Sequence, residues 1–106
     1  MGVIKEESVI NDNPEMYYEG LIYFKDKYQN FEAECYAAMN KERFDELTNN
    51  VHALKGLAAT LGMTKLQKLS YALELSLKEK DTKVDDNLDA MIKELKLVLD
   101  GLVQLG

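Results

Sequence analysis

Residues 44–62 read FDELTNNVHALKGLAATLG, and the spacing of their apolar side chains decides the fold class. These side chains recur at alternating steps of three and four residues, which places them on one face of an α-helix. The stripe consists of Phe44, Leu47, Val51, Leu54, Ala58 and Leu61. Gly62 follows it, and glycine readily adopts the left-handed conformation that ends helices. The sequence therefore predicts a helix that ends at Gly62.

A longer stripe of the same kind precedes this helix, in residues 14–39. It predicts a single helix whose first turn contains Pro14 and whose cap is Asn13 or Asp12. Its apolar face comprises Tyr17, Leu21, Phe24, Tyr28, Phe31, Cys35 and Ala38. We interpret the tyrosines as packing residues of the core and its rim, because an aromatic stripe at helical spacing is more often core than binding site.

Two further stripes follow Gly62. Thr64 and Gln67 have the spacing of a capping box, which predicts a third helix that starts at Thr64. Its apolar residues are Leu66, Leu69, Leu73 and Leu77. A break at Asp81–Thr82 then separates it from a fourth stripe. That stripe consists of Leu88, Met91, Leu95, Val98 or Leu99, Leu102 and Leu105.

The pattern of the whole chain is helical, because no segment alternates with the period of a strand. The fold class is therefore all-α. Four amphipathic helices with short connections predict an antiparallel up-down four-helix bundle over residues 13–106. Residues 1–12 are mixed in composition and polar at their end, and we expect them to form a short N-terminal arm that is either flexible or packed as a short segment.

The composition restricts the partners and the compartment. The chain has 13 Lys and Arg residues against 19 Asp and Glu, a net charge of −6, so repulsion from phosphates argues against nucleic-acid binding. Cys35 is the only cysteine, which leaves no internal disulfide and favours a reducing compartment. No apolar run reaches the ~18–20 residues that span a membrane, and the N-terminus lacks the apolar core of a signal peptide. We expect a cytoplasmic monomer that does not contact membranes.

His52 is the only histidine, and the helical pattern places it on the polar side. It follows the core residue Val51 by ~100° of helix rotation. Its neighbours at three and four residues are Thr48, Asn49, Lys55 and Gly56, none of which is a large apolar residue. A surface histidine is inert in most proteins, so its surroundings must decide whether it has a function.

Small side chains surround this histidine. A glycine in the middle of a helix, here Gly56, lowers stability by ~1 kcal/mol relative to alanine. Ala59, one turn further, is also small. One interpretation is that the imidazole is left clear so that a partner's active site can close over it. The alternative is that Gly56 lets a neighbouring helix approach closely.

The residues around His52 form a motif, with Leu, Lys and Gly at two, three and four residues after it, a small residue at six and Gly at ten. They are His52, Leu54, Lys55, Gly56, Ala58 and Gly62. The motif resembles the signature of histidine-containing phosphotransfer (HPt) domains, which carry a phosphoryl group on one histidine in two-component phosphorelays. The resemblance extends over residues 14–105 as four helices, although only the motif is specific. Leu57-Ala58 departs from the small or hydroxyl residues of many members, which bears on partner preference.

The resemblance implies a phosphocarrier in which His52 is the phosphoacceptor. A receiver domain presents an aspartyl phosphate, and Nε2 of neutral His52 attacks it in line and later passes the group to a second receiver. Lys55 is expected to stabilise the phosphoryl oxygens as a point charge. The implied partners are response-regulator receiver domains and a hybrid sensor histidine kinase. Mg²⁺ is expected on the receiver, and no cofactor or metal on this chain. The implied docking surface comprises Thr48, Asn49, Gly56, Ala59 and Lys78.

A second site residue follows from the expected turn after Gly62. If the second and third helices reverse at residue 63, positions 52 and 74 are equally far from the turn and lie level. Glu74 can then accept a hydrogen bond from Nδ1–H of His52, which fixes the tautomer and leaves Nε2 free. Glu or Gln at this separation is common in domains that the motif resembles. The alternative is that Glu74 is a solvated surface residue.

Other functions find little support in the residues. The chain has no glycine-rich nucleotide loop, so we expect no kinase activity and no enzyme in that sense. A di-metal bundle needs Glu-x-x-His motifs, and residue 49 is Asn. No serine or cysteine motif accompanies the histidine for hydrolysis. The remaining alternative is a helical scaffold that binds a receiver or kinase without accepting phosphate.

Overall fold

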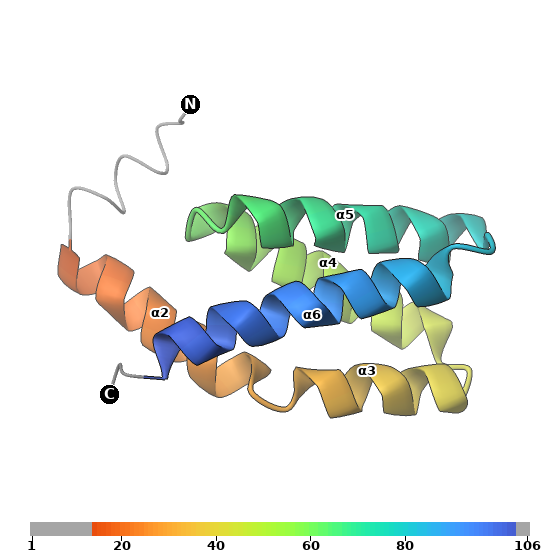
Figure 1. Ribbon diagram of the computed structural model, residues 1–106, viewed down its shortest axis with the longest axis horizontal. Helices are drawn as coiled ribbons and strands as arrows, with labels where there is room; N and C mark the ends of the chain where they lie inside the picture. Colours follow the sequence, from red (N-terminus) through yellow and green to blue (C-terminus); the bar gives the residue numbers. More distant parts are fainter. Residues whose placement is uncertain (1–13, 104–106) are drawn as a thin grey trace.

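The computed structural model describes residues 14–103, which form five helices and, within that range, no strand (Figure 1). The helices are α2 (Pro14–Tyr28), α3 (Phe31–Asn40), α4 (Phe44–Thr60), α5 (Thr64–Glu79) and α6 (Val84–Leu102). The all-α fold class is confirmed. The predicted arm at residues 1–12, the cap at Asn13 or Asp12 and the core position Leu105 lie outside the described residues. None of the described helices is long and apolar enough to cross a membrane.

The prediction of one helix over residues 14–39 is wrong, because the chain turns at Gln29 and Asn30 between α2 and α3. Asparagine favours turns and helix starts, since its side chain competes for backbone hydrogen bonds. The Glu34 amide donates to the Asn30 carbonyl at 3.2 Å, which begins the new helix. The rings of Tyr28 and Phe31 meet edge to face across the turn, with centroids 5.0 Å apart. The apolar stripe therefore continues through the break and conceals it.

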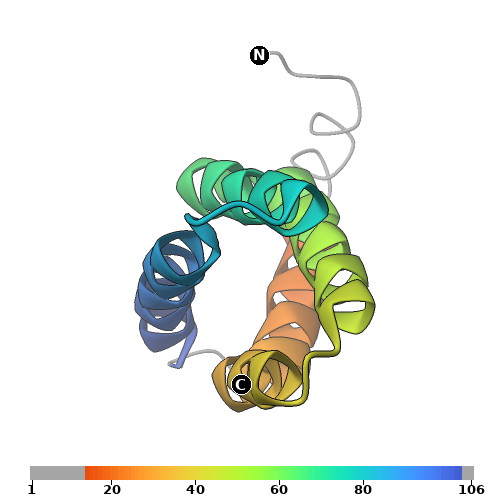
Figure 2. The same ribbon diagram turned by 90° about the vertical axis from the view of Figure 1, so that its right-hand side faces the viewer.

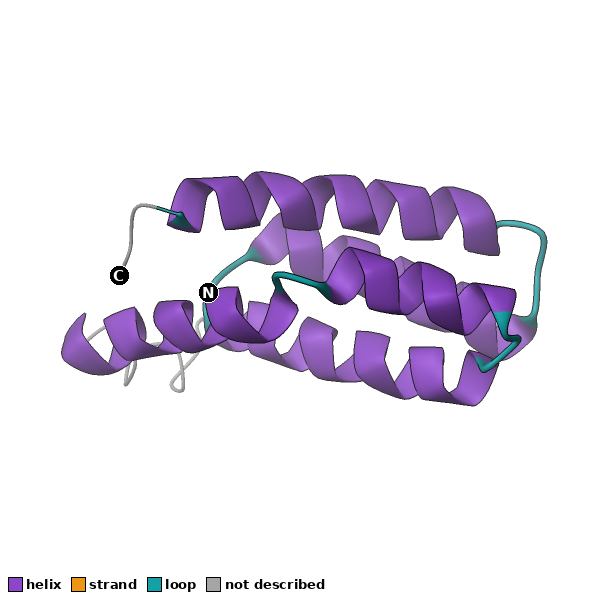
Figure 3. Ribbon diagram, turned by 90° about the horizontal axis from the view of Figure 1, so that it is seen from below, coloured by secondary structure: helices purple, strands orange, loops and turns teal. Residues whose placement is uncertain are grey.

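The helices from α3 to α6 reverse direction at each short connection, and α2 and α3 run the same way along the long axis (Figure 1, Figure 3). The two short helices together occupy the place of the predicted first helix. In the end-on view, α4, α5, α6 and the α2–α3 limb surround a common axis (Figure 2). The α4–α5 turn contains Gly62 at φ +76°, as the glycine signal predicted.

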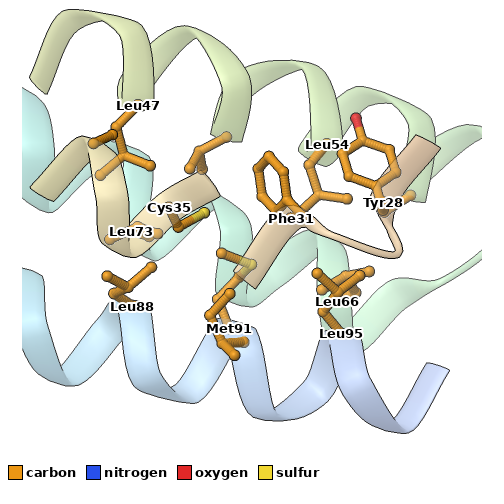
Figure 4. Close-up of a cluster of buried hydrophobic side chains, with 14 of the residues drawn as sticks. Tyr28, Phe31, Cys35, Leu47, Leu54, Leu66, Leu73, Leu88, Met91 and Leu95 are labelled. Carbon is orange, nitrogen blue, oxygen red and sulfur yellow. The ribbon is translucent and has the colours of Figure 1, made fainter. Parts of the chain in front are cut away.

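The core fills the space between these helices with the predicted stripes. Figure 4 shows side chains from every limb meeting there, including Leu54 of α4, Leu73 of α5 and Met91 of α6. All three are fully buried, and so is Cys35, the free cysteine of α3. Burial raises the pKa of the Cys35 thiol to about 12, so this cysteine is an unreactive packing residue.

Two local predictions are wrong. Phe44 was assigned to the core, but 38% of it is exposed, because it occupies the first turn of α4 at the end of the bundle. Thr64 and Gln67 were expected to form a capping box. Instead Met63 is the N-cap of α5 and no side chain caps the helix. The backbone N–H of Gln67 donates to the Met63 carbonyl at 2.9 Å, so Thr64 is already the first helical residue.

The start of α2 packs against the end of α4. The Tyr17 hydroxyl donates to the Leu61 carbonyl at 3.3 Å. A Cβ atom at Gly20 would lie 2.9 Å from Cδ2 of Leu61, so the absence of a side chain there permits the close approach. These contacts join the start of α2 to the turn that follows α4.

Candidate functional site

The site is built on the outer face of α4, where His52 lies in the middle of the helix. Its neighbours Val51 and Leu54 are both completely buried and hold α4 to the core. The next position around the helix must therefore face outwards. Accordingly, 65% of the His52 side chain is exposed. The predicted surface location of the histidine is confirmed.

Glu74 of α5 reaches this histidine. The distance between Nδ1 of His52 and Oε2 of Glu74 is 2.8 Å. The two residues lie on opposite sides of the α4–α5 turn, so the argument from equal distance to the turn correctly placed them side by side. Only 3% of the Glu74 side chain is exposed, which rules out the alternative of a solvated surface residue.

Glu74 is the centre of a cluster with three donors. Besides His52, its Oε1 accepts from Lys55 Nζ at 2.7 Å, and its Oε2 lies 3.2 Å from Lys78 Nζ. Burial alone raises the pKa of a carboxyl group, but the hydrogen bonds from Lys55, His52 and Lys78 together outweigh it. The net result lowers the pKa of Glu74 to about 2. Glu74 is therefore a carboxylate at neutral pH.

The ionised carboxylate determines the histidine tautomer. A carboxylate accepts hydrogen bonds and has no proton to donate, so the hydrogen of the 2.8 Å contact belongs to Nδ1 of His52. In the neutral ring the other nitrogen, Nε2, then carries a lone pair. Because the side chain is largely exposed, this lone pair is available to a reagent from solution or from a partner.

Lys55 has a position that the sequence argument did not foresee. It was expected to act only on an incoming phosphoryl group, but it is bound to the same carboxylate as His52. Its Nζ also lies 5.2 Å from the centroid of the Tyr71 ring. Tyr71 was missed by the sequence reading, although its spacing of three residues from Glu74 puts both on one face of α5.

The remaining predicted docking residues share the outer face of α4. Asn49 and Gly56 are exposed, whereas Thr48 and Ala59 are half-buried. The Thr48 hydroxyl donates to the Phe44 carbonyl at 2.7 Å. A Cβ atom on Gly56 would meet nothing within 4 Å, so no neighbouring helix requires this glycine. The alternative that Gly56 permits close helix packing is wrong.

The charge around His52 is opposite to that of the chain. Two ammonium groups and one carboxylate leave an excess positive charge in the cluster, whereas the net charge of the chain is −6. An anion is therefore attracted locally although the protein as a whole repels it. Within residues 14–103, no three His, Cys, Asp or Glu side chains converge to hold a metal ion.

The imidazole stands on an open surface. A groove of about 400 Å³ lies elsewhere, between α6 and the end of α2, and contains none of the predicted site residues. It is lined by Lys25, Tyr28, Gln29, Glu32, Leu95, Lys96, Leu99, Asp100 and Val103. The exposed side chain of His52 is therefore open both to small reagents from solution and to the surface of a protein partner.

Comparison with known proteins identifies a family for this helical chain. The family model for the Hpt domain matches residues 19–104, which include the whole cluster around His52. No curated protein and no solved structure matches the chain. Hpt domains are phosphocarriers of two-component signalling that interact with receiver domains and kinases and are not kinases themselves. The match covers most of the chain, and the protein therefore belongs to the Hpt domain family.

Proposed function

We propose that the chain is a phosphorelay intermediate, in which His52 accepts a phosphoryl group and passes it to the aspartate of a response regulator. The donor is either the aspartyl phosphate of a receiver domain or a sensor kinase. The observation that carries the proposal is the 2.8 Å contact of Nδ1 with Glu74, because it leaves the lone pair of Nε2 on the exposed part of the ring. The Hpt family match supports the same residue as the carrier.

The transfer step balances without further reagents. The Nε2 lone pair forms a bond to phosphorus while the bond between phosphorus and the aspartyl oxygen breaks, and its electron pair leaves with the carboxylate. The proton on Nδ1 stays in place, so the ring acquires a positive charge as the bond forms. The Glu74 carboxylate, 2.8 Å away, stabilises that charge.

Two lysines supply charge for the phosphoryl oxygens in this proposal. Lys55 and Lys78 both lie within hydrogen-bonding distance of the Glu74 carboxylate that binds the imidazole. Phosphoryl transfer depends mainly on positioning and on charge stabilisation, which these groups can supply. Mg²⁺ belongs to the receiver in this scheme, and the chain contributes no metal ligand.

A protein partner must dock around the imidazole, and we propose that it uses the outer face of α4 with the adjoining edge of α5. The face offers small or polar side chains at Thr48, Asn49, Gly56 and Ala59, with Lys78 beside them. The unobstructed space at Gly56 supports this assignment, because the glycine lowers helix stability and packing gives no reason for it.

Incubation with a phosphorylated receiver domain tests the proposal. We expect the protein to acquire a label that is lost in acid, because phosphohistidine is acid-labile. His52→Gln should fold normally, since the side chain is exposed, and should take no label. Lys83→Gln, an exposed change in the α5–α6 connection, is the matched control and should label like the parent. A parent protein that binds the receiver but takes no label is instead a scaffold, and an acid-labile label on His52→Gln would refute the proposal.

A further inference from the structure

The ammonium of Lys55 contacts two residues of α5. Oε1 of Glu74 is 2.7 Å from Nζ, and the Tyr71 ring, over which Nζ lies, has its centroid 5.2 Å away. Only 23% of the Lys55 side chain is exposed, an unusually enclosed position for a lysine at a bundle surface. The aromatic face attracts the cation and restricts the motion of its long side chain.

The restriction matters because the Glu74 carboxylate is shared. His52 and Lys78 both use Oε2, at 2.8 and 3.2 Å, whereas Lys55 uses Oε1. A free lysine side chain samples many rotamers, and holding it in one position requires an additional contact. The Tyr71 ring provides that contact on the Oε1 side. Lys55 is thereby kept beside the imidazole without competing for the oxygen that orients it.

We propose that Tyr71 is a positioning residue for phosphoryl transfer, which holds the Lys55 ammonium ready for the phosphoryl group that arrives at Nε2 of His52. The inference rests on the proposed function of His52 and adds a residue that the motif does not contain. Tyr71 is half exposed and contacts Lys55 through its ring, so in this proposal it acts through Lys55. Transition-state charge on the phosphoryl oxygens is stabilised best by a cation that is already in place.

A small phosphodonor separates this role from partner docking. Phosphoramidate needs no docking surface: its P–N bond breaks, ammonia leaves, and the bond from Nε2 of His52 to phosphorus forms. The rate of phosphohistidine formation, followed by ³¹P NMR or by intact mass, then reports on the site alone. A loss of the cation–π contact should slow this rate about three- to fivefold, in line with the strength of such contacts at partly exposed sites.

Four single variants and one double variant carry the test. Tyr71→Leu removes the aromatic face, and Tyr71→Phe keeps it, so the rate should fall in the first and stay within about twofold of the parent in the second. Tyr23→Leu is the matched control, because Tyr23 is an equally exposed tyrosine on α2 outside the cluster. In a Lys55→Ala background, Tyr71→Leu should cause no further loss. Thermal unfolding monitored by circular dichroism checks that each variant folds.

The outcomes distinguish this inference from the proposed function. An unchanged phosphoramidate rate in Tyr71→Leu overturns the positioning role, and so does an equal loss in the Lys55→Ala background or a failure of Tyr71→Phe to restore the rate. If Tyr71→Leu slows transfer only from a phosphorylated receiver, Tyr71 is a docking residue and the inference is wrong. If the parent protein takes no acid-labile phosphate from either donor, the proposed function fails as well.

Discussion

The contact between α4 and α5, here called the seam, has an apolar side that faces the core and a polar side that faces solvent. Its inner side is a continuous apolar surface lined by Leu54, Ala58, Leu66 and Leu73. Its outer side carries His52, Lys55, Glu74 and Lys78, which are joined through one carboxylate. The same two helices therefore supply both the stability of the bundle and the proposed chemistry, within one helical turn of each other.

Two polar residues of α5 make the contrast sharper. Glu74, on the outer side, is buried but has three hydrogen-bonding partners. Ser70, one turn earlier, is completely buried, and its hydroxyl has no partner among the described residues. A buried polar group stabilises a fold only when its hydrogen bonds are satisfied. The polar group of Glu74 is thus satisfied, whereas the buried hydroxyl of Ser70, on the same helix, is a local defect.

The largest expected effect is on the inner side. Leu54→Ala removes a completely buried side chain of α4 and should lower the free energy of unfolding by about 2–5 kcal/mol, through lost burial and the cavity left behind. Leu97→Ala, at an exposed leucine of α6, is the matched control and should change it by less than about 0.5 kcal/mol. Denaturant titration of both variants measures the difference. Equal losses would show that the apolar seam does not dominate stability.

The next largest expected effect is a pH-dependent loss of stability when Glu74, on the outer side, is replaced. Because the pKa of Glu74 is lowered from 4.5 to about 2, its stabilising contribution is complete above pH 4.5 and is lost as pH falls towards 2. The contribution is on the order of 3 kcal/mol for a buried carboxylate with this shift. Glu74→Gln should therefore be less stable at pH 6, and the difference from the parent should narrow steadily below pH 4.5.

Urea titrations at several pH values check this dependence. Glu79→Gln, which changes an exposed carboxylate at the end of the same helix, is the matched control and should follow the parent curve. If the difference between Glu74→Gln and the parent stays constant from pH 6 to pH 2, the three hydrogen bonds do not hold the carboxylate in its ionised form.

The inner side was largely predictable from the sequence, because burial follows the period of the helix. The stripes of α4, α5 and α6 identified core residues such as Val51, Leu73 and Met91. The break at Gln29 and Asn30 was not predictable in this way, since the apolar spacing is continuous across it. Periodicity reports which face a residue occupies, and it carries no information on whether the backbone turns between two residues of that face.

The side-chain contacts on the outer side of the seam were only partly predictable from the sequence. The pairing of His52 with Glu74 followed from their equal distance to the turn at Gly62, which needs only helix rise and a tight connection. The attachment of Lys55 and Lys78 to the same carboxylate did not follow. Which long side chains converge on one oxygen depends on the rotation of both helices about their axes and on rotamers. Sequence spacing alone fixes neither of these.

Ser70→Ala should sharpen the contrast by raising stability. The change removes a buried hydroxyl without a partner and replaces serine by a better helix former, so we expect a gain of about 1 kcal/mol in the free energy of unfolding. Ser76→Ala is the matched control with the opposite sign. Its hydroxyl accepts from the Asn87 amide at 2.6 Å, so its loss should destabilise by about 1 kcal/mol. Thermal unfolding of both variants tests this, and a loss of stability in Ser70→Ala would mean that the hydroxyl is satisfied in solution.

The smallest expected change in stability lies on the outer face, at Gly56. Alanine and glutamine are both better helix formers than glycine, and a Cβ atom at this position meets nothing within 4 Å. Gly56→Ala and Gly56→Gln should each raise the free energy of unfolding, by about 0.5–1 kcal/mol. If stability were the only demand on this position, a larger residue would serve better than glycine. Packing among residues 14–103 gives no reason for this glycine, whereas the proposed docking of a partner supplies one.

The two variants should therefore differ in transfer although they agree in stability. Gly56→Gln places a long side chain one turn from His52 and should slow transfer from a phosphorylated receiver about tenfold or more, because the partner can no longer close over the imidazole. Gly56→Ala adds one methyl group and should slow it much less. Labelling by phosphoramidate, which needs no docking, should be similar in both. Undiminished receiver transfer in Gly56→Gln would mean that the partner approaches from another direction, and the open surface around the histidine would then need a different explanation.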